Sequence, residues 1–223
     1  MTSRTALLLG ATGLVGGHLL NQLGADSRYS RVTALVRRPL SGVDNPEGRL
    51  DARVVDFERL AEQWDFTTTD VYCCLGTTMN SSRETLRRVD HDYPVEVARL
   101  ARAAGARRLA IVSAVGANPE SRVSLLRVKG ETEQDIAALG YECVEIFQPA
   151  TLLGDRTKPR TGQGVANAIG PVVARAMVGP LKRFRPVRSE NVAAAMIAAL
   201  QRDEPGVHTR TYPEIMALAA TAR

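Results

Sequence analysis

The chain has 223 residues, of which 44% are hydrophobic, so it is long enough for one domain with a substantial core. Its 29 basic and 24 acidic residues leave a formal net charge of +5, which suits anionic small ligands but is too small and too scattered to indicate nucleic-acid binding. The three cysteines have no repeated spacing, which argues against disulfides or a zinc site and favours a cytoplasmic protein. No apolar run is long enough for a signal peptide or a membrane span.

The first predicted element is a short buried strand that leads into a glycine-rich turn. Residues 6–9 read Ala-Leu-Leu-Leu, residues 10–16 read Gly-Ala-Thr-Gly-Leu-Val-Gly, and a helix with leucines on one face follows. Glycines allow a tight turn close to a pyrophosphate, and the free N–H groups of a helix start favour an anion. The pattern therefore predicts a nucleotide site, with a plain strand-to-helix turn that needs positive φ as the alternative.

Strand and helix patterns then alternate. Apolar runs predict further strands at 31–36, 53–56, 70–75, 109–112 and 143–147. Periodic segments predict helices at 58–63, 82–104 and 123–139, and Pro94 is expected to start the second half of the long one. Near-continuous apolar strands between helices predict an α/β fold, a Rossmann-type doubly wound parallel sheet.

The pattern loosens after residue 153. A loop is predicted at 157–164, with short helices near 165–177 and 190–201, and Ser189 suits the N-cap of the last one. We expect a single domain over 1–223, with a dinucleotide-binding core at about 1–153 and a small C-terminal cap on the substrate side at about 154–223. The basic run 182–188 is interpreted as a solvated surface, with attraction of an acidic substrate or partner as the alternative.

Two arginines at the end of the second predicted strand bear on the choice of cofactor. NAD-specific sites carry an acidic residue there, which binds the ribose 2′-hydroxyl. Arg37 and Arg38 would instead pair with a 2′-phosphate, so they favour NADP(H) over NAD(H), unless they are solvated loop charges. His18, His91 and His208 stand apart in the sequence without metal-ligand spacing, so no metal site is expected.

Several sequence strings fall in the order found in one enzyme family. They are the glycine turn, Val-Asp-Phe at 55–57, Cys-Cys-Leu-Gly-Thr-Thr at 73–78, Val-Asp at 89–90, Ser113, and Val-Lys-Gly-Glu at 128–131. Through them the chain resembles the atypical short-chain dehydrogenases/reductases, and more narrowly the Tat-interacting-protein-like oxidoreductases, over nearly its whole length.

This resemblance implies a set of cofactor-binding residues. Asp56 would contact the adenine, with a helix cap as the alternative. Residues 75–77 would lie beside the adenosine ribose, residues 149–152 would pass the nicotinamide, and Lys129 would hold the nicotinamide ribose. The full set is Gly10, Thr12, Gly13, Leu14, Val15, Gly16, Arg37, Arg38, Asp56, Phe57, Leu75, Gly76, Thr77, Lys129, Pro149, Thr151 and Leu152.

The resemblance also implies catalytic residues, with one departure. The family uses a serine, a tyrosine and a lysine, of which the tyrosine passes a proton to the carbonyl oxygen. Ser113 and Lys129 match the serine and the lysine, but the tyrosine position, four residues before the lysine, is Leu125. Tyr93 is the most plausible substitute, with packing as the alternative. Lys129 could also protonate the substrate if its pKa were lowered.

Three functions follow from these residues. The first is an NADP(H)-dependent oxidoreductase that reduces a carbonyl or quinone-like small molecule, in which Ser113 polarises the oxygen and Lys129 orients the cofactor. The second is an NADPH-binding regulatory or interaction protein with little turnover, which Leu125 favours. A sugar-nucleotide epimerase ranks below both, since it needs the same missing proton carrier.

Overall fold

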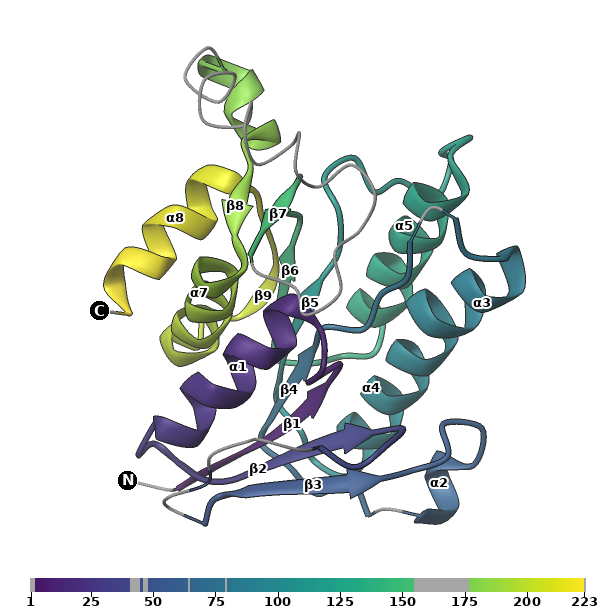
Figure 1. Ribbon diagram of the computed structural model, residues 1–223, viewed down its shortest axis with the longest axis vertical. Coiled ribbons are helices and arrows are strands. Elements are labelled where there is room, and N and C mark those ends of the chain that lie inside the picture. Colours follow the sequence, from purple (N-terminus) through teal and green to yellow (C-terminus); the bar gives the residue numbers. More distant parts are fainter. Residues whose placement is uncertain are drawn as a thin grey trace.

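A seven-stranded parallel sheet lies between two layers of helices (Figure 1). The computed structural model describes residues 3–40, 45, 48–63, 65–78, 80–154 and 177–222. The sheet order is β3-β2-β1-β4-β5-β6-β9, and its strands are β1 (Arg4–Leu9), β2 (Tyr29–Val36), β3 (Leu50–Val54), β4 (Asp70–Cys73), β5 (Arg108–Val112), β6 (Cys143–Phe147) and β9 (Gly206–Arg210). This confirms the predicted Rossmann-type doubly wound sheet.

Helices cover both faces of the sheet. One face carries α1 (Leu14–Ala25), α7 (Ser189–Arg202) and α8 (Tyr212–Thr221), and the other carries α4 (Tyr93–Ala103) and α5 (Ser124–Ala137) (Figure 1). The remaining elements are short: α2 (Leu60–Gln63), α3 (Arg83–Arg87), the π-helical turn η1 (Arg88–Asp92), the 3₁₀ helix η2 (Gly179–Phe184), and a separate pair of strands, β7 (Leu152–Leu153) and β8 (Val187–Arg188).

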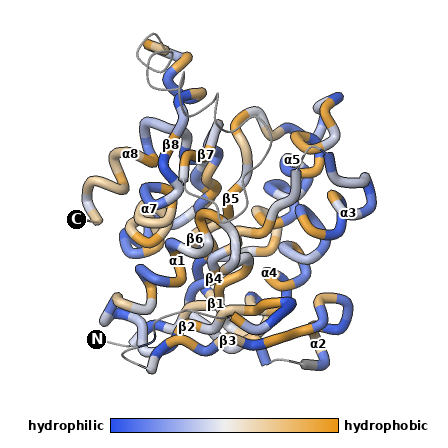
Figure 2. Tube along the Cα trace, viewed as in Figure 1, coloured by the Kyte–Doolittle hydropathy of each residue, from blue (hydrophilic) through white to orange (hydrophobic). Residues whose placement is uncertain are grey.

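The core has two halves, one on each face of the sheet. Successive side chains of a strand point to opposite faces. In β1, Leu8 therefore packs in the cluster shared with α1 and α7, whereas Leu7 and Leu9 pack in the cluster shared with α4 and α5. The flanking helices alternate between hydrophobic and hydrophilic positions, as α4 shows in Figure 2. Each fully buried leucine contributes about 1.5–3 kcal/mol.

The C-terminal segment differs in part from the prediction. The helix predicted near 190–201 is α7, but Ser189 is its first residue rather than its N-cap. Neither β9 nor α8 is predicted from the sequence. β9 pairs with β6, so the sheet extends beyond residue 153. The predicted loop at 157–164 and the helix near 165–177 lie outside the described residues, except for Met177.

The long helix predicted over 82–104 is interrupted by the π-helical turn η1. α3 ends at Arg87, η1 follows, and α4 carries Pro94 in its first turn as predicted. The wider turn buries the side chains of Asp90 and His91. Single π-helical turns inside helices occur often at functional sites, and Asp90 belongs to one, as described below.

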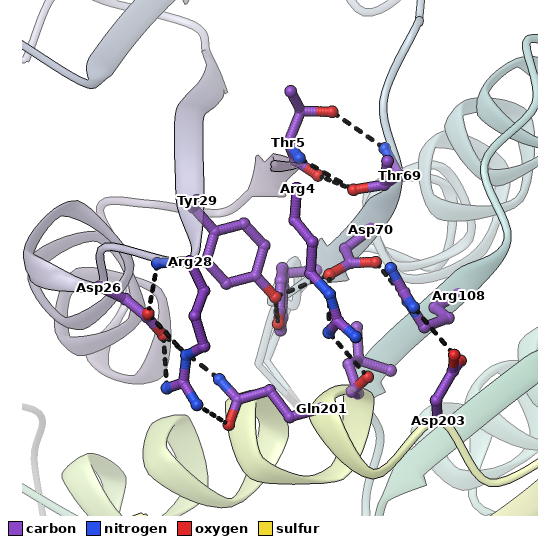
Figure 3. Close-up of polar contacts among 12 residues, drawn as sticks. Arg4, Thr5, Asp26, Arg28, Tyr29, Thr69, Asp70, Arg108, Gln201 and Asp203 are labelled. Carbon is purple, nitrogen blue, oxygen red and sulfur yellow. Dashed lines mark hydrogen bonds and ion pairs between the residues drawn. The ribbon is translucent and has the colours of Figure 1, made fainter. Parts of the chain in front are cut away.

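A buried polar network ties the amino ends of the strands together (Figure 3). Asp70 accepts hydrogen bonds from the Tyr29 hydroxyl at 2.7 Å and from Arg108 Nε at 2.6 Å. Arg108 also pairs with Asp203, just beyond α7, at 3.2 Å. Burial raises the pKa of Asp70, against the opposing effect of the Tyr29 and Arg108 hydrogen bonds. The network anchors α7 to the edge of the sheet opposite the candidate site.

Candidate functional site

A cavity of about 500 Å³ opens at the carboxyl ends of β1, β2 and β4. In a doubly wound sheet this is the switch point where ligands bind, because the chain turns to opposite faces from neighbouring strands. The described residues that line the cavity are Gly10, Ala11, Thr12, Gly13, Leu35, Val36, Arg37, Arg38, Pro39, Phe57, Cys74, Leu75, Gly76, Val89 and Tyr93.

The glycine turn lies against this cavity and has no room for larger residues. Gly10 has φ +80°, and a Cβ there would lie 2.5 Å from the Cys74 carbonyl oxygen. A Cβ at Gly16 would lie 2.0 Å from the Gly10 carbonyl oxygen. Gly13 caps α1 without a side-chain hydrogen bond, so the first N–H groups of the helix, those of Leu14 and Val15 among them, have no capping side chain. These features fit a pyrophosphate.

Arg37 and Arg38 line the cavity at the end of β2, as predicted from their position. Both are exposed. None of the described residues that line the cavity is acidic. The cavity therefore offers cationic side chains at the point where NAD-specific sites carry a carboxylate.

Phe57 and Tyr93 form one wall of the cavity. Their ring centroids are 5.2 Å apart, and the Tyr93 hydroxyl donates to Glu58. These contacts hold Tyr93 beside Phe57, so they give no support to Tyr93 as a substitute for the missing tyrosine. Asp56 does not line the cavity; its carboxylate accepts the Glu58 N–H at 3.0 Å in a turn before α2, which begins only at Leu60, so Asp56 is not the cap of that helix.

Lys129 is buried beneath the neighbouring loop. Its Nζ lies 2.9 Å from Asp90 Oδ1, 3.3 Å from the Leu75 carbonyl oxygen and 3.4 Å from that of Val112. Asp90 Oδ2 accepts the Thr77 N–H at 2.9 Å. Asp90 thus holds the lysine at the ends of β4 and β5.

Ser113 follows β5 and is buried. Its hydroxyl donates to Glu133 of α5, and Gln148, which follows β6, donates to the same carboxylate at 2.9 and 3.0 Å. Burial raises the pKa of Glu133, whereas the hydrogen bonds from Ser113 and Gln148 and the charge of Lys129 oppose the rise. Glu133 is not among the residues predicted from the sequence, where its only signal is its position one helical turn after Lys129.

The remaining predicted residues lie outside the cavity. Pro149 and Thr151 lie between β6 and β7, and Leu152 is the first residue of β7. The Pro149 carbonyl oxygen accepts the Val115 N–H at 3.1 Å, and that of Thr151 accepts the Val187 N–H at 2.9 Å. The structure therefore places this segment near the loop after β5, and it does not line the cavity that holds the glycine turn.

His208 is less isolated than its sequence position indicates. Its ring nitrogen and the carboxylates of Glu145 and Glu204 lie within 4.8 Å of one another. Arg210 occupies the centre of this group, since its Nε pairs with Glu145 at 2.7 Å and its Nη2 with Glu204 at 2.9 Å. The arginine offsets one of the two negative charges and occupies oxygen atoms of both carboxylates, which weakens the case for a cation site.

Comparisons with known proteins agree with this geometry. A family model described as NAD(P)H-binding matches residues 10–203. The protein HTATIP2 of Rattus norvegicus is 36% identical over 169 residues, which cover 74% of this chain and 70% of that protein. The mitochondrial protein FMP52 of Candida glabrata is 33% identical over 216 residues, which cover 95% and 91%.

Solved structures show the same fold. The Bordetella bronchiseptica enzyme WbmH in complex with NAD+ matches with a TM-score of 0.69 at 14% identity, over 93% of this chain and 75% of that one. A UDP-glucose 4-epimerase of Thermotoga maritima matches with a TM-score of 0.67 at 14% identity, over 97% and 82%. At such identities the likeness concerns the fold alone.

The expectation of a cytoplasmic protein is wrong by these comparisons. The FMP52 proteins of Candida glabrata, Eremothecium gossypii and Saccharomyces cerevisiae are all named mitochondrial. The expectation rested on cysteine usage, which reports on redox conditions and does not tell one reducing compartment from another. In the part of the chain that the structure describes, no helix is long and apolar enough to cross a membrane.

Proposed function

Since this chain belongs to the NAD(P)H-binding family of atypical short-chain dehydrogenases/reductases, we propose that it is an NADP(H)-dependent oxidoreductase that reduces a carbonyl or quinone-like small molecule. One observation carries the proposal. Lys129 Nζ contacts the carbonyl oxygen of Leu75, which lines the cavity, and that of Val112, which precedes Ser113. A single buried ammonium group thus lies between the candidate dinucleotide cavity and the candidate catalytic serine.

Each group has a task in this proposal. The glycine turn and the start of α1 bind the pyrophosphate, and Arg37 and Arg38 pair with the 2′-phosphate. The reduced nicotinamide supplies a hydride when bound. Lys129 holds the nicotinamide ribose and Ser113 donates a hydrogen bond to the substrate oxygen. The segment 154–223 contributes to the substrate side.

A second candidate is an NADPH-binding regulatory protein with little turnover. Two observations favour it. Leu125 stands where the family has its tyrosine, and the Ser113 hydroxyl already has a partner in Glu133. Both candidates bind the same cofactor, so only turnover separates them.

The test is an assay of NADPH consumption by protein whose NADPH binding has first been confirmed by fluorescence. A panel of aldehydes, ketones and quinones is offered to the wild type and to Leu125→Tyr. We expect measurable reduction by the wild type and a rise of about tenfold or more in the variant, because a positioned general acid contributes roughly 10²–10⁴-fold.

Tight NADPH binding without turnover on any substrate would contradict the oxidoreductase and leave the regulatory protein. An unchanged rate in Leu125→Tyr would mean that the substrate oxygen does not lie beside that position of α5.

A further inference from the structure

The Ser113 hydroxyl is bonded to a carboxyl group that spans the ends of two strands. Glu133 Oε1 accepts from Ser113 and from Gln148 Nε2 at 2.9 Å, and Oε2 lies 3.0 Å from the same Gln148 nitrogen. Ser113 follows β5 and Gln148 follows the neighbouring β6. The carboxyl is therefore held by two uncharged side chains at the carboxyl edge of the sheet, where ligands of this fold bind.

Helix α5 brings this carboxyl onto the face that the family uses for chemistry. Leu125, Lys129 and Glu133 follow one another at intervals of four residues, so they occupy successive turns on one side of the helix. Leu125, at the first of these positions, cannot donate a proton. Glu133, at the third, carries an ionisable group that contacts the candidate catalytic serine directly.

We propose that Glu133 supplies, through Ser113, the proton that the substrate oxygen takes up when its carbonyl carbon is reduced. The proposal rests on the proposed function. Protonated Glu133 donates to Ser113 Oγ, which leaves the Ser113 proton directed at the carbonyl oxygen. As the carbonyl carbon accepts the nicotinamide hydride, its oxygen takes the proton of Ser113, and Ser113 Oγ takes the proton of Glu133.

The step balances in atoms and electrons. The substrate gains a hydride and a proton, the nicotinamide loses two electrons, and Glu133 ends as a carboxylate. Glu133 is only partly buried, so water can return its proton. Because it acts through Ser113, Glu133 is a positioning and proton-supplying residue rather than one that touches the substrate.

The surroundings of Glu133 favour its protonated form. Burial raises its pKa above the ordinary glutamate range. From β5 and β6 the contacting groups, Ser113 and Gln148, are uncharged. Among the described residues the charge that acts on it is that of Lys129, whose ammonium pairs with Asp90 of η1. Titration of Glu133 therefore dominates the expected pH dependence of the proton supply.

The kinetic test compares Glu133→Gln with Glu131→Gln, whose glutamate pairs with Arg87 at the end of α3. In the wild type, kcat falls as the pH rises through the pKa of Glu133, since only the protonated form supplies a proton. Glu133→Gln lowers kcat by about 100-fold and abolishes this fall, because a general acid contributes roughly 10²–10⁴-fold. Its NADPH affinity is unchanged, and Glu131→Gln behaves as the wild type.

Two further variants separate proton supply from a purely structural role. Glu133→Asp keeps a carboxyl group and restores part of the rate together with the pH dependence. Gln148→Ala removes a donor that favours the ionised form, so the fall in kcat moves to higher pH. A purely structural role would predict no such movement of the pH profile.

A second readout does not depend on turnover. In protein with ¹³C-labelled glutamate, the signal that Glu133→Gln removes is titrated by NMR, and we expect its pKa to lie above the ordinary value. A Glu133 that ionises at or below that value would overturn the proposal. An active wild type whose rate and pH profile survive Glu133→Gln overturns it too, but leaves the proposed function standing. A wild type that binds NADPH and reduces nothing overturns both.

Discussion

At the scale of single residues, the glycine turn is the strictest feature of the chain. Alanine at position 16 would place its Cβ 2.0 Å from the Gly10 carbonyl oxygen, whereas alanine at position 17 would meet the nearest backbone atom, the Ala11 carbonyl oxygen, at an ordinary 3.6 Å. The two glycines are neighbours on α1 and differ mainly in this space. The first is required by close packing, and the second is not.

We therefore predict opposite outcomes for Gly16→Ala and Gly17→Ala. Gly16→Ala displaces the turn, so it lowers the thermal unfolding temperature and weakens NADPH binding by tenfold or more. Gly17→Ala retains the NADPH affinity and does not lower the unfolding temperature. Because alanine has a better helix propensity than glycine, this variant gains up to about 1 kcal/mol in the free energy of unfolding. Thermal unfolding and NADPH fluorescence titration measure the two effects. Equal behaviour of both variants would refute the packing argument.

Individual site residues could be predicted from sequence only where a motif fixes the position. The glycine turn, the arginines after β2 and the pair Ser113 and Lys129 have such motifs. Glu133 has none, because its importance depends on Ser113 and Gln148 reaching it from two other elements. Asp90 stands in the sequence only as part of the Val-Asp motif at 89–90. Its ion pair with Lys129 depends on the π-helical turn η1, which the sequence does not predict.

At the scale of elements, the buried network at the amino edge makes Arg108 costly to lose. Arg108 and Asp70 are buried, and removal of Arg108 leaves the Asp70 carboxylate with only the more distant Arg4, 3.8 Å away, as a cationic partner. Arg107, the preceding residue, forms an exposed ion pair with Glu142. The two arginines at the start of β5 thus both pair with a carboxylate, but the pair of Arg108 is buried and the pair of Arg107 is exposed.

We predict that Arg108→Leu lowers the free energy of unfolding by about 3–5 kcal/mol, measured by urea denaturation at neutral pH. Burial already raises the pKa of Asp70, and loss of Arg108 raises it further. As the pH falls and Asp70 becomes neutral, the difference in free energy of unfolding between the wild type and Arg108→Leu therefore becomes smaller. Arg107→Ala, the matched control, changes little because exposed pairs contribute little. A small effect of Arg108→Leu at neutral pH would count against the network.

Elements with strong hydrophobic patterns were predicted well, and those without were missed. Five of the first six strands along the chain are apolar enough to be recognised. The exception is β3, which reads Leu-Asp-Ala-Arg-Val and is mostly exposed, so the strand predicted at 53–56 overlaps it only at residues 53 and 54. β9 is an edge strand that reads Gly-Val-His-Thr-Arg, and its Val207 is half exposed, so its pairing with β6 leaves little pattern in the sequence. The π-helical turn within the long helix likewise has no signature, since it inserts into a continuous helical pattern.

At the scale of the whole molecule, the parallel sheet brings the ends of distant strands to one edge (Figure 1). β1 supplies the glycine turn, β2 the arginines, β4 the loop over Lys129, and β5 and β6 the partners of Glu133. Alternation of strands and helices in the sequence predicts this convergence. We propose that cofactor choice then depends on side chains at one corner of the edge, those of Arg37 and Arg38.

The central claim is that this edge holds NADP(H). The most direct measurement is a calorimetric titration of the wild type with NADPH and with NADH, repeated on Arg37→Ala and Arg38→Ala and on the control Arg31→Ala, an exposed arginine elsewhere on β2. We predict that the wild type binds NADPH more tightly than NADH by about 10- to 100-fold, since a charge-assisted phosphate contact contributes about 1.5–3 kcal/mol. Loss of Arg37 or Arg38 removes much of this preference, and loss of Arg31 does not. Binding of neither dinucleotide, or equal binding of both, would contradict the account.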